Sequence, residues 1–253
     1  MERTIKCLAL NAIAFLVVIM VSCQKDAEFQ TTSTDDFLDN NQPTQIYPVD
    51  NNLKVSSILN ATSATQIPTQ FFRSDQRYKT AYIHVKQYDG ECSWTSYTLA
   101  AGAIANGDGE TYTVNHEKIT YVRNWCKSKY IEQLYAFATQ KDNWIFTNVC
   151  LSKKVVSPAG RFLMIKDMLY HLETYKKPFV AIITSSGVGH YVVVWSIDWK
   201  CGGTGSTVYY TDSLDPVAST FDNQIKSMSL TSFLDKMGPN NPSVNTYCAL
   251  FLR

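Results

Sequence analysis

A glycine turn that runs directly into a cysteine constrains this chain more than any other feature. After Gly90 and Glu91, Cys92 opens a segment rich in Ala and Leu that keeps helical periodicity until Asn106 and Gly107. The sequence therefore predicts a helix with Cys92 in its first turn. Unpaired N–H groups and the helix dipole lower the pKa of a thiol at such a position, and the thiolate is the nucleophilic form.

Two further residues supply what a reactive thiolate needs. Gln87 lies shortly upstream, where its side-chain amide can stabilise an oxyanion beside the sulfur. His190 follows a Gly-Val-Gly approach and heads the apolar run Tyr-Val-Val-Val-Trp, which predicts a strand with a histidine at its mouth. The non-catalytic alternatives are that Cys92 is a structural or disulfide cysteine and that His190 only forms a hydrogen bond with a backbone carbonyl.

The other three histidines lack this context. We expect His84 in the middle of a short strand, His116 in a polar turn, and His171 on the outer side of an amphipathic helix.

A group that orients His190 should lie on the neighbouring strand. Asp198 is on the same strand, and eight residues at about 3.3 Å each put it too far away. Asp212 ends the run Val-Tyr-Tyr-Thr-Asp, and Asp215 precedes Pro216. Hairpin counting favours Asp215, whereas a bulge in the glycine loop would bring Asp212 into place.

Together these residues resemble the papain-like cysteine peptidases, and within them the compact branch typified by C39-like bacteriocin-leader peptidases. The shared pattern is a Gln, a Cys that opens a helix, Gly-His-Tyr-Val-Val-Val, and a strand that ends in Asp. The resemblance covers about half of the chain. It implies Cys92 as nucleophile, His190 as base and Asp212 as orienting acid. It also implies that Gln87 and the Cys92 N–H hold the oxyanion.

Helical patterns precede most of the strand patterns. We expect helices from residue 92 and at 118–130, 131–139 and 161–175, a short strand or loop at 144–149, and strands at 79–85, 179–184, 191–197, 207–211 and 246–252. A chain in which helices are followed by the strands of an antiparallel sheet belongs to the α+β class. This is also the papain-like order, in which a nucleophile helix and a helical part pack on a C-terminal antiparallel sheet.

The N-terminus has the pattern of a targeting segment. Arg3 and Lys6 precede an apolar run, residues 8–21, that is too short for a comfortable membrane span. Met-Val-Ser before Cys23 resembles the bacterial lipobox, in which Cys23 becomes the lipidated first residue. The alternative is an ordinary secretory signal with an incidental cysteine.

These patterns divide the chain into three parts. We expect a lipoprotein signal peptide at 1–22, a flexible tether at 23–75 and the peptidase domain at 76–253. An exported bacterial lipoprotein without an inner-membrane retention signal is expected at the outer membrane, facing the periplasm or the cell surface. An inhibitory prosegment is the alternative for the apolar stretch that ends the tether.

The remaining cysteines suggest disulfides. Cys126, Cys150, Cys201 and Cys248 form an even set in an exported protein, so we expect at least one disulfide, with Cys201–Cys248 as the tentative pair. Cys92 is then the free thiol.

Charge and composition limit the kinds of partner that we expect for this protein. The formal net charge of the 253 residues is +1 and no block of like charges occurs, which argues against nucleic acid or an anionic membrane surface. No Cys-x-x-Cys or His-x-x-x-His pair and no phosphate-binding glycine loop is present, so we expect neither metal nor cofactor.

The leading interpretation is therefore a hydrolase, a thiol peptidase acting on a peptide or protein, with membrane contact only through the lipid anchor. A transglutaminase-like acyl transferase or deamidase with the same triad is the second. A non-catalytic surface binding module on the same scaffold is the third.

Overall fold

The computed structural model describes residues 69–185, 188–200, 205–237 and 246–253, all of them within the compact unit Pro68–Arg253. The described helices are α3 (Gln76–Thr80), α4 (Cys92–Gly107), α5 (His116–Cys126), α6 (Ile131–Gln140), α7 (Pro158–Thr174), α8 (Phe221–Gln224) and α9 (Leu230–Lys236). The described strands are β1 (Thr69–Arg73), β2 (Val149–Val155), β3 (Phe179–Ser185), β4 (Val188–Lys200), β5 (Thr207–Asp212), β6 (Ile225–Ser229) and β7 (Thr246–Leu252).

These strands form one antiparallel sheet in the order β2-β7-β3-β4-β5-β6. The long strand β4 has two partners on one side: its first half pairs with β3, and its second half pairs with β1. The register between β4 and β5 shifts between Val194 and Ser196, so Trp195 is an extra residue on β4.

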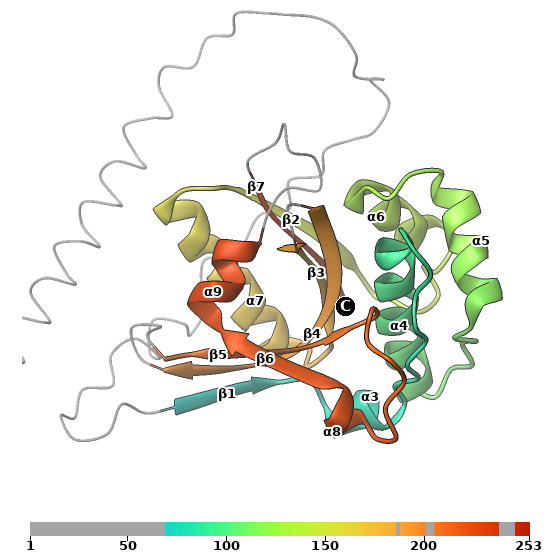
Figure 1. Cartoon of the computed structure of the whole chain (residues 1–253), viewed down its shortest axis with the longest axis horizontal. Coiled ribbons are helices and arrows are strands. Elements are labelled where there is room, and N and C mark those ends of the chain that lie inside the picture. The colour runs from blue at the N-terminus through green and yellow to red at the C-terminus, as the bar shows by residue number, and fades with distance from the viewer. Residues whose placement is uncertain (1–68, 186–187, 201–204, 238–245) are drawn as a thin grey trace, which may run out of the picture. The chain divides into compact units, whose positions relative to one another are not determined.

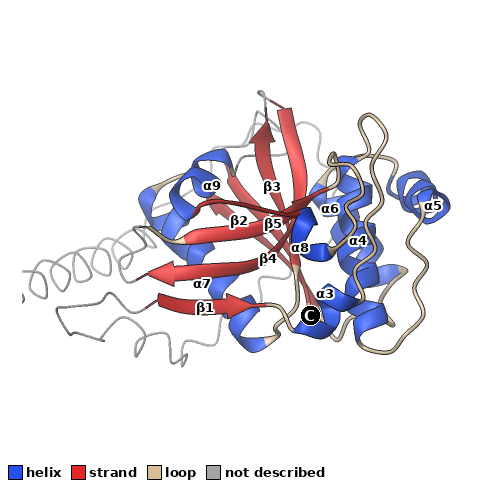
Figure 2. Cartoon of the chain, turned by 60° about the horizontal axis from the view of Figure 1, so that its bottom comes forward, coloured by secondary structure: helices blue, strands red, loops and turns tan. Residues whose placement is uncertain are grey.

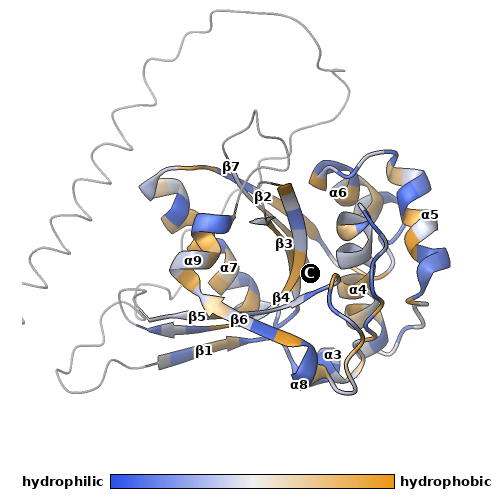
Figure 3. Ribbon diagram, viewed as in Figure 1, coloured by the Kyte–Doolittle hydropathy of each residue, from blue (hydrophilic) through white to orange (hydrophobic). Residues whose placement is uncertain are grey.

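Helices cover both faces of this sheet (Figures 1 and 2). The helices α4, α5 and α6 lie on one side, where α4 contacts β4 and α6 contacts β2 and β7. On the other side α7 packs on β2, β1 and β7, and α9 packs on β3 and β6. The apolar residues of β3 and β4 lie between these two layers, as the hydropathy colouring shows (Figure 3).

Short polar residues cap four of the described helices, among them the longer helices α5 and α7. The Asn115 side chain accepts a hydrogen bond from the Lys118 N–H (2.9 Å) and caps α5. The Ser157 hydroxyl accepts from the Gly160 N–H (3.0 Å) and caps α7, whose first residue is Pro158. The helix α4 has no side-chain cap, which leaves its first turn open to other partners.

The mixed class of helices and an antiparallel sheet is confirmed, but several elements differ from the prediction. The expected strand at 79–85 is wrong, because residues 76–80 form α3 and the chain from 82 to 88 has no regular structure. The strands β1 and β6 were not expected, and β2 was expected only as a short strand or loop over residues 144–149. All three are confined to the sheet's edges.

The described part of the chain begins within the predicted tether. Residues 69–73 form β1 and pair with β4, whereas the predicted tether extends to residue 75. The predicted signal peptide, Cys23 and the rest of the tether lie outside the described residues. No described helix is long and apolar enough to cross a bilayer.

A buried carboxylate ties the helical layer together. Asp142, which is 2% exposed, accepts hydrogen bonds from the hydroxyls of Tyr97 and Tyr112 (2.9 Å each) and pairs with Lys118 (3.4 Å). Burial, followed by the nearby carboxylate, raises the pKa of both tyrosines well above the usual value. This network joins α4 and α5 to the segment that follows α6.

We expect Asp142→Ala to lower the free energy of unfolding by about 2–4 kcal/mol, because it leaves two buried hydroxyls unpaired. Urea denaturation measures the change. Asp89→Ala removes an exposed carboxylate with no side-chain hydrogen bond to a described residue, and should stay within about 0.5 kcal/mol of the wild type. Equal effects of the two substitutions would contradict the network's role.

Candidate active site

Cys92 is the first residue of α4 and is 8% exposed. The first backbone hydrogen bond of the helix runs from the Thr95 N–H to the Glu91 carbonyl (2.9 Å), so the amides of residues 92–94 have no partner within the helix. The Glu91 carboxylate pairs with Arg123 (2.7 Å), which fixes the start of α4 to α5. The thiol therefore lies at an anchored helix terminus with open N–H groups.

His190 lies beside this thiol. It stands near the start of β4, is 6% exposed, and is close enough to Cys92 for each residue to shift the pKa of the other. Its Nε2 lies 2.7 Å from Asp212 Oδ1. Because Nε2 is engaged by the carboxylate, Nδ1 is the nitrogen left for the sulfur. The structure thus brings Cys92, His190 and Asp212 together.

The strand register explains why Asp212 reaches His190. Asp212 pairs with Val192, and His190 lies two residues farther along the same face of β4. The register shift responsible lies between Val194 and Ser196. Most of the glycine loop, where the sequence analysis placed the bulge, is outside the described residues. Asp215 lies beyond the end of β5, in a turn where its N–H bonds to the Asp212 carbonyl (3.1 Å).

The three groups shift one another's titration. Burial opposes each charge, but the interactions of the ring N–H groups with the acceptors Asp212 and Cys92 raise the pKa of His190 to about 9. For Cys92 the burial penalty is exceeded by His190, the Tyr191 N–H and the charge of Lys129, so the thiol pKa is lowered. Burial opposes ionisation of Asp212 as well, yet His190 and the Leu214 N–H lower its pKa. A thiolate–imidazolium pair follows from these directions.

Gln87 contacts the residue that follows Asp212. It is 8% exposed, its N–H donates to the Ser213 carbonyl (2.9 Å), and its Oε1 accepts from the Ser213 hydroxyl (2.5 Å). Its Nε2 donates no hydrogen bond to a described residue. The amide therefore has a free donor end next to the loop that follows Asp212.

Lys226 supports that loop from β6. Its ammonium lies 2.7 Å from Asp215 Oδ1 and 3.6 Å from Asp212 Oδ2. Burial lowers and the two carboxylates raise the pKa of Lys226, with a net increase, and its charge adds to the factors that keep Asp212 ionised. The preferred Asp212 thus contacts His190, whereas the alternative Asp215 pairs with Lys226.

The other histidines do not lie where the sequence placed them. His84 is in an irregular segment, where it contacts the Tyr82 hydroxyl (2.8 Å) and the Asp215 carbonyl (3.1 Å). His171 is fully buried in α7 against Phe179 and Phe251, and burial lowers its pKa to about 3. The predicted outer position of His171 is wrong, because the side of α7 that carries it packs against the sheet.

His116 also differs from its predicted position in a turn. It opens α5, and its ring stacks on that of Tyr88 at 4.1 Å.

The spare cysteines do not form the expected disulfide. Cys126, Cys150 and Cys248 carry free thiols. The predicted Cys201–Cys248 disulfide is absent, because Cys248 is a free thiol. Cys201 itself lies outside the described residues. Burial raises the pKa of all three thiols, that of Cys126 to about 12. Of the four described cysteines, Cys92 alone has a lowered pKa.

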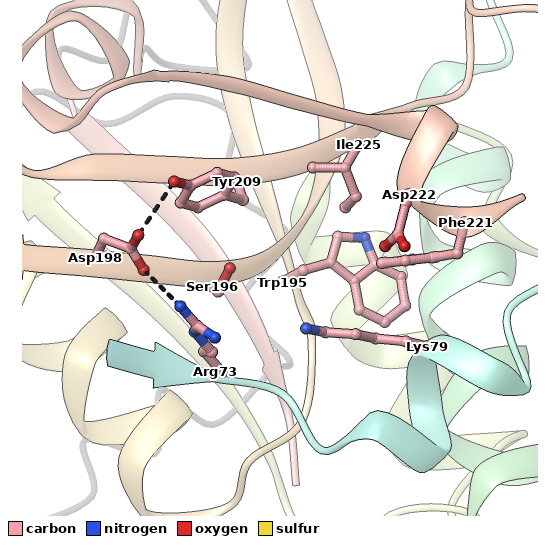
Figure 4. A pocket seen from close by; sticks show the side chains of 9 residues that line it. All are labelled: Arg73, Lys79, Trp195, Ser196, Asp198, Tyr209, Phe221, Asp222 and Ile225. Carbon is pink, nitrogen blue, oxygen red and sulfur yellow. Dashed lines mark hydrogen bonds and ion pairs between the residues drawn. The ribbon is translucent and has the colours of Figure 1, made fainter. Parts of the chain in front are cut away.

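No group of three or more metal-binding side chains gathers among the described residues. A pocket of about 280 Å³ lies between β1, β4, β5 and α8 (Figure 4). Two of its charged side chains pair with each other, since Arg73 lies 3.6 Å from Asp198, which also accepts from the Tyr209 hydroxyl (3.1 Å). The pocket contains none of the predicted site residues.

Comparisons with known proteins add little to this geometry. No protein-family model and no curated protein matches the chain. Among solved structures, the crystal structure of UfSP from C. elegans is similar over 74% of this chain and 35% of that one, with a TM-score of 0.47 and 9% sequence identity. The chain thus spans about a third of that protein's length. A likeness of this degree carries no functional argument, so the site is interpreted from its own residues.

Sequence reasoning missed two residues around the site. Ser213 follows Asp212 directly, and Lys226 lies on a strand that was not expected. The position of Ser213 next to a candidate acid was the available signal for the first. Nothing in the local pattern marks Lys226, because its contact with Asp212 depends on the pairing of β5 with β6.

We expect Asp212→Asn to lower the pKa of His190 and raise that of Cys92, because the carboxylate's hydrogen bond and charge favour the imidazolium. In the wild type the imidazolium persists until about pH 9, and the thiolate forms below the usual thiol range. The rate of Cys92 alkylation measured against pH should therefore shift to higher pH in the variant. Asp215→Asn should leave the curve in place, and the reverse result would show that the wrong aspartate was assigned.

Proposed function

We propose that this protein is a cysteine peptidase that hydrolyses peptide bonds through Cys92, His190 and Asp212. The observation that carries the proposal is the Cys92 thiol at the start of α4 interacting with His190, whose Nε2 lies 2.7 Å from Asp212 Oδ1. A thiolate beside an imidazolium, with the ring oriented by a third group, is the arrangement that thiol hydrolases need.

The first half-reaction follows from these positions. The Cys92 sulfur attacks the carbonyl carbon, and the carbonyl electron pair moves onto oxygen. The free amide end of Gln87 and the Cys92 N–H donate to that oxyanion. When the tetrahedral intermediate collapses, the carbon–nitrogen bond breaks, the amine takes the proton from His190, and a thioester remains on Cys92.

The second half-reaction regenerates the enzyme. Neutral His190 accepts a proton from water as the water oxygen attacks the thioester carbon. The carbon–sulfur bond then breaks, which releases the carboxylic acid product and restores the thiolate and imidazolium; the acid proton passes to solvent or to the released amine. Asp212 holds the ring by Nε2 in both halves, so that the other nitrogen faces the reacting atoms.

The proposal includes the fold type and the cellular location of the protein. We assign a papain-like fold, in which the helix α4 carries the nucleophile and the sheet carries the base and the acid. The lipobox-like residues before Cys23 support an exported bacterial lipoprotein at the outer membrane. Its signal peptide would occupy residues 1–22, and a tether would lead to the peptidase domain.

Cys92→Ala and His190→Ala should each remove nearly all peptide cleavage while the fold stays intact. Their effects should not add, because nucleophile and base act as a unit. A peptide-library assay that counts new N-termini measures cleavage, and ammonia release detects deamidation instead. Cys150→Ala removes a thiol outside the site and serves as the matched control. Full activity in Cys92→Ala would overturn the mechanism.

Cys23→Ala should abolish metabolic labelling by fatty acid and release the protein from the membrane fraction. The reason is that the lipobox cysteine provides the attachment point for the acyl chains. Labelling that persists in this variant would show that the anchor lies elsewhere. Retention of the protein in the soluble fraction of wild-type cells would count against lipidation altogether.

A further inference from the structure

Ser213 makes two contacts with Gln87. Its hydroxyl donates to Gln87 Oε1 at 2.5 Å, and its carbonyl accepts from the Gln87 N–H at 2.9 Å. Ser213 is 1% exposed and Gln87 is 8% exposed, so water competes little for either contact. The pair joins the segment before α4 to the residue that follows Asp212.

A glutamine amide has an acceptor end and a donor end, and only the donor end stabilises an oxyanion. A hydroxyl that donates to Oε1 fixes that oxygen toward Ser213 and leaves Nε2 as the outward end. The rotated amide would present a lone pair to a developing negative charge, which is repulsive. The direction of this one hydrogen bond therefore decides whether Gln87 can assist the reaction.

We propose that Ser213 is a positioning residue that orients the Gln87 amide for oxyanion stabilisation. The inference rests on the proposed thiol chemistry of Cys92. Residues 212 and 213 then have parallel tasks, since Asp212 orients His190 and Ser213 orients Gln87. Ser213 contacts neither the thiol nor the substrate and acts only through the amide.

Two reactions of Cys92 separate this role from a general structural one. Acylation by p-nitrophenyl acetate passes through a tetrahedral oxyanion, whereas alkylation by iodoacetamide is a displacement at carbon without one. Ser213→Ala should slow Cys92 acylation about tenfold, as expected for loss of one oriented hydrogen bond. Its alkylation rate should stay within about twofold of the wild type. Mass spectrometry of the Cys92 peptide follows both reactions.

A double-mutant cycle tests whether Ser213 acts through Gln87. Gln87→Ala alone should slow acylation by about 10²–10³-fold. Adding Ser213→Ala to Gln87→Ala should cause no further loss, because the group that Ser213 orients is gone. Ser213→Thr keeps the hydroxyl and should restore most of the rate. Ser213→Gly removes the same hydroxyl and replaces the alanine variant if that variant does not fold.

Ser152→Ala is the matched control. The Ser152 hydroxyl is also buried and donates to Asp167 Oδ2 (2.6 Å), between β2 and α7 and outside the site. It should leave both rates unchanged.

The outcomes separate the two proposals. If wild-type Cys92 is alkylated but never acylated, the hydrolase mechanism fails, and the role of Ser213 fails with it. If the wild type is acylated and Ser213→Ala is acylated equally fast, only the positioning role is overturned. Additive losses in the double variant, or equal slowing of acylation and alkylation, would likewise overturn it.

Discussion

The packing of α4 on β4 is the contact on which the site depends. The helix is buried over most of its length, and its small residues, among them Ala100 and Ala103, allow it to lie close to the sheet. The Ser96 hydroxyl donates to the Tyr191 carbonyl (2.9 Å), which fixes the first turn of the helix along the strand. Cys92 is one turn from this contact and His190 is one residue from it, so the reactive pair is positioned by the core.

Burial and charge act in opposite directions on the thiols, and their balance explains why one cysteine differs. Burial alone raises the pKa of Cys126, and burial of Cys248 outweighs the hydrogen bond to Thr246 and the charge of Lys153, so the pKa values of both thiols rise. Cys92 is also buried, but an imidazolium and a backbone N–H face its sulfur. The lowered pKa of Cys92 thus depends on the positive partner at the start of β4.

The parts of the fold that depend on local pattern could be predicted, and those that depend on pairing could not. The Ala-rich segment after Cys92 is a helix and Thr246–Leu252 is a strand, as expected from their composition. The strand β6 and the buried position of His171 follow from tertiary contacts, which override weak local preferences. Among the site residues, the geometry around Cys92 and His190 agrees with the sequence pattern, whereas Ser213 and Lys226 become visible only through strand pairing.

Asp212 shows most clearly which contacts cannot be predicted from the sequence. Between Ser196 and Asp198 the β4–β5 register pairs residues whose numbers sum to 405, whereas between Val192 and Val194 the sum is 404. Without that one-residue shift Asp212 would pair with Val193, and its carboxylate would point to the face opposite His190. A tryptophan carries no recognisable bulge signal, so the sequence could not locate the shift. Because Asp212 and Ser213 are consecutive, the same shift places the contacts of both His190 and Gln87. A change that straightens β4 at Trp195 would therefore disrupt base orientation and the Gln87 contact together.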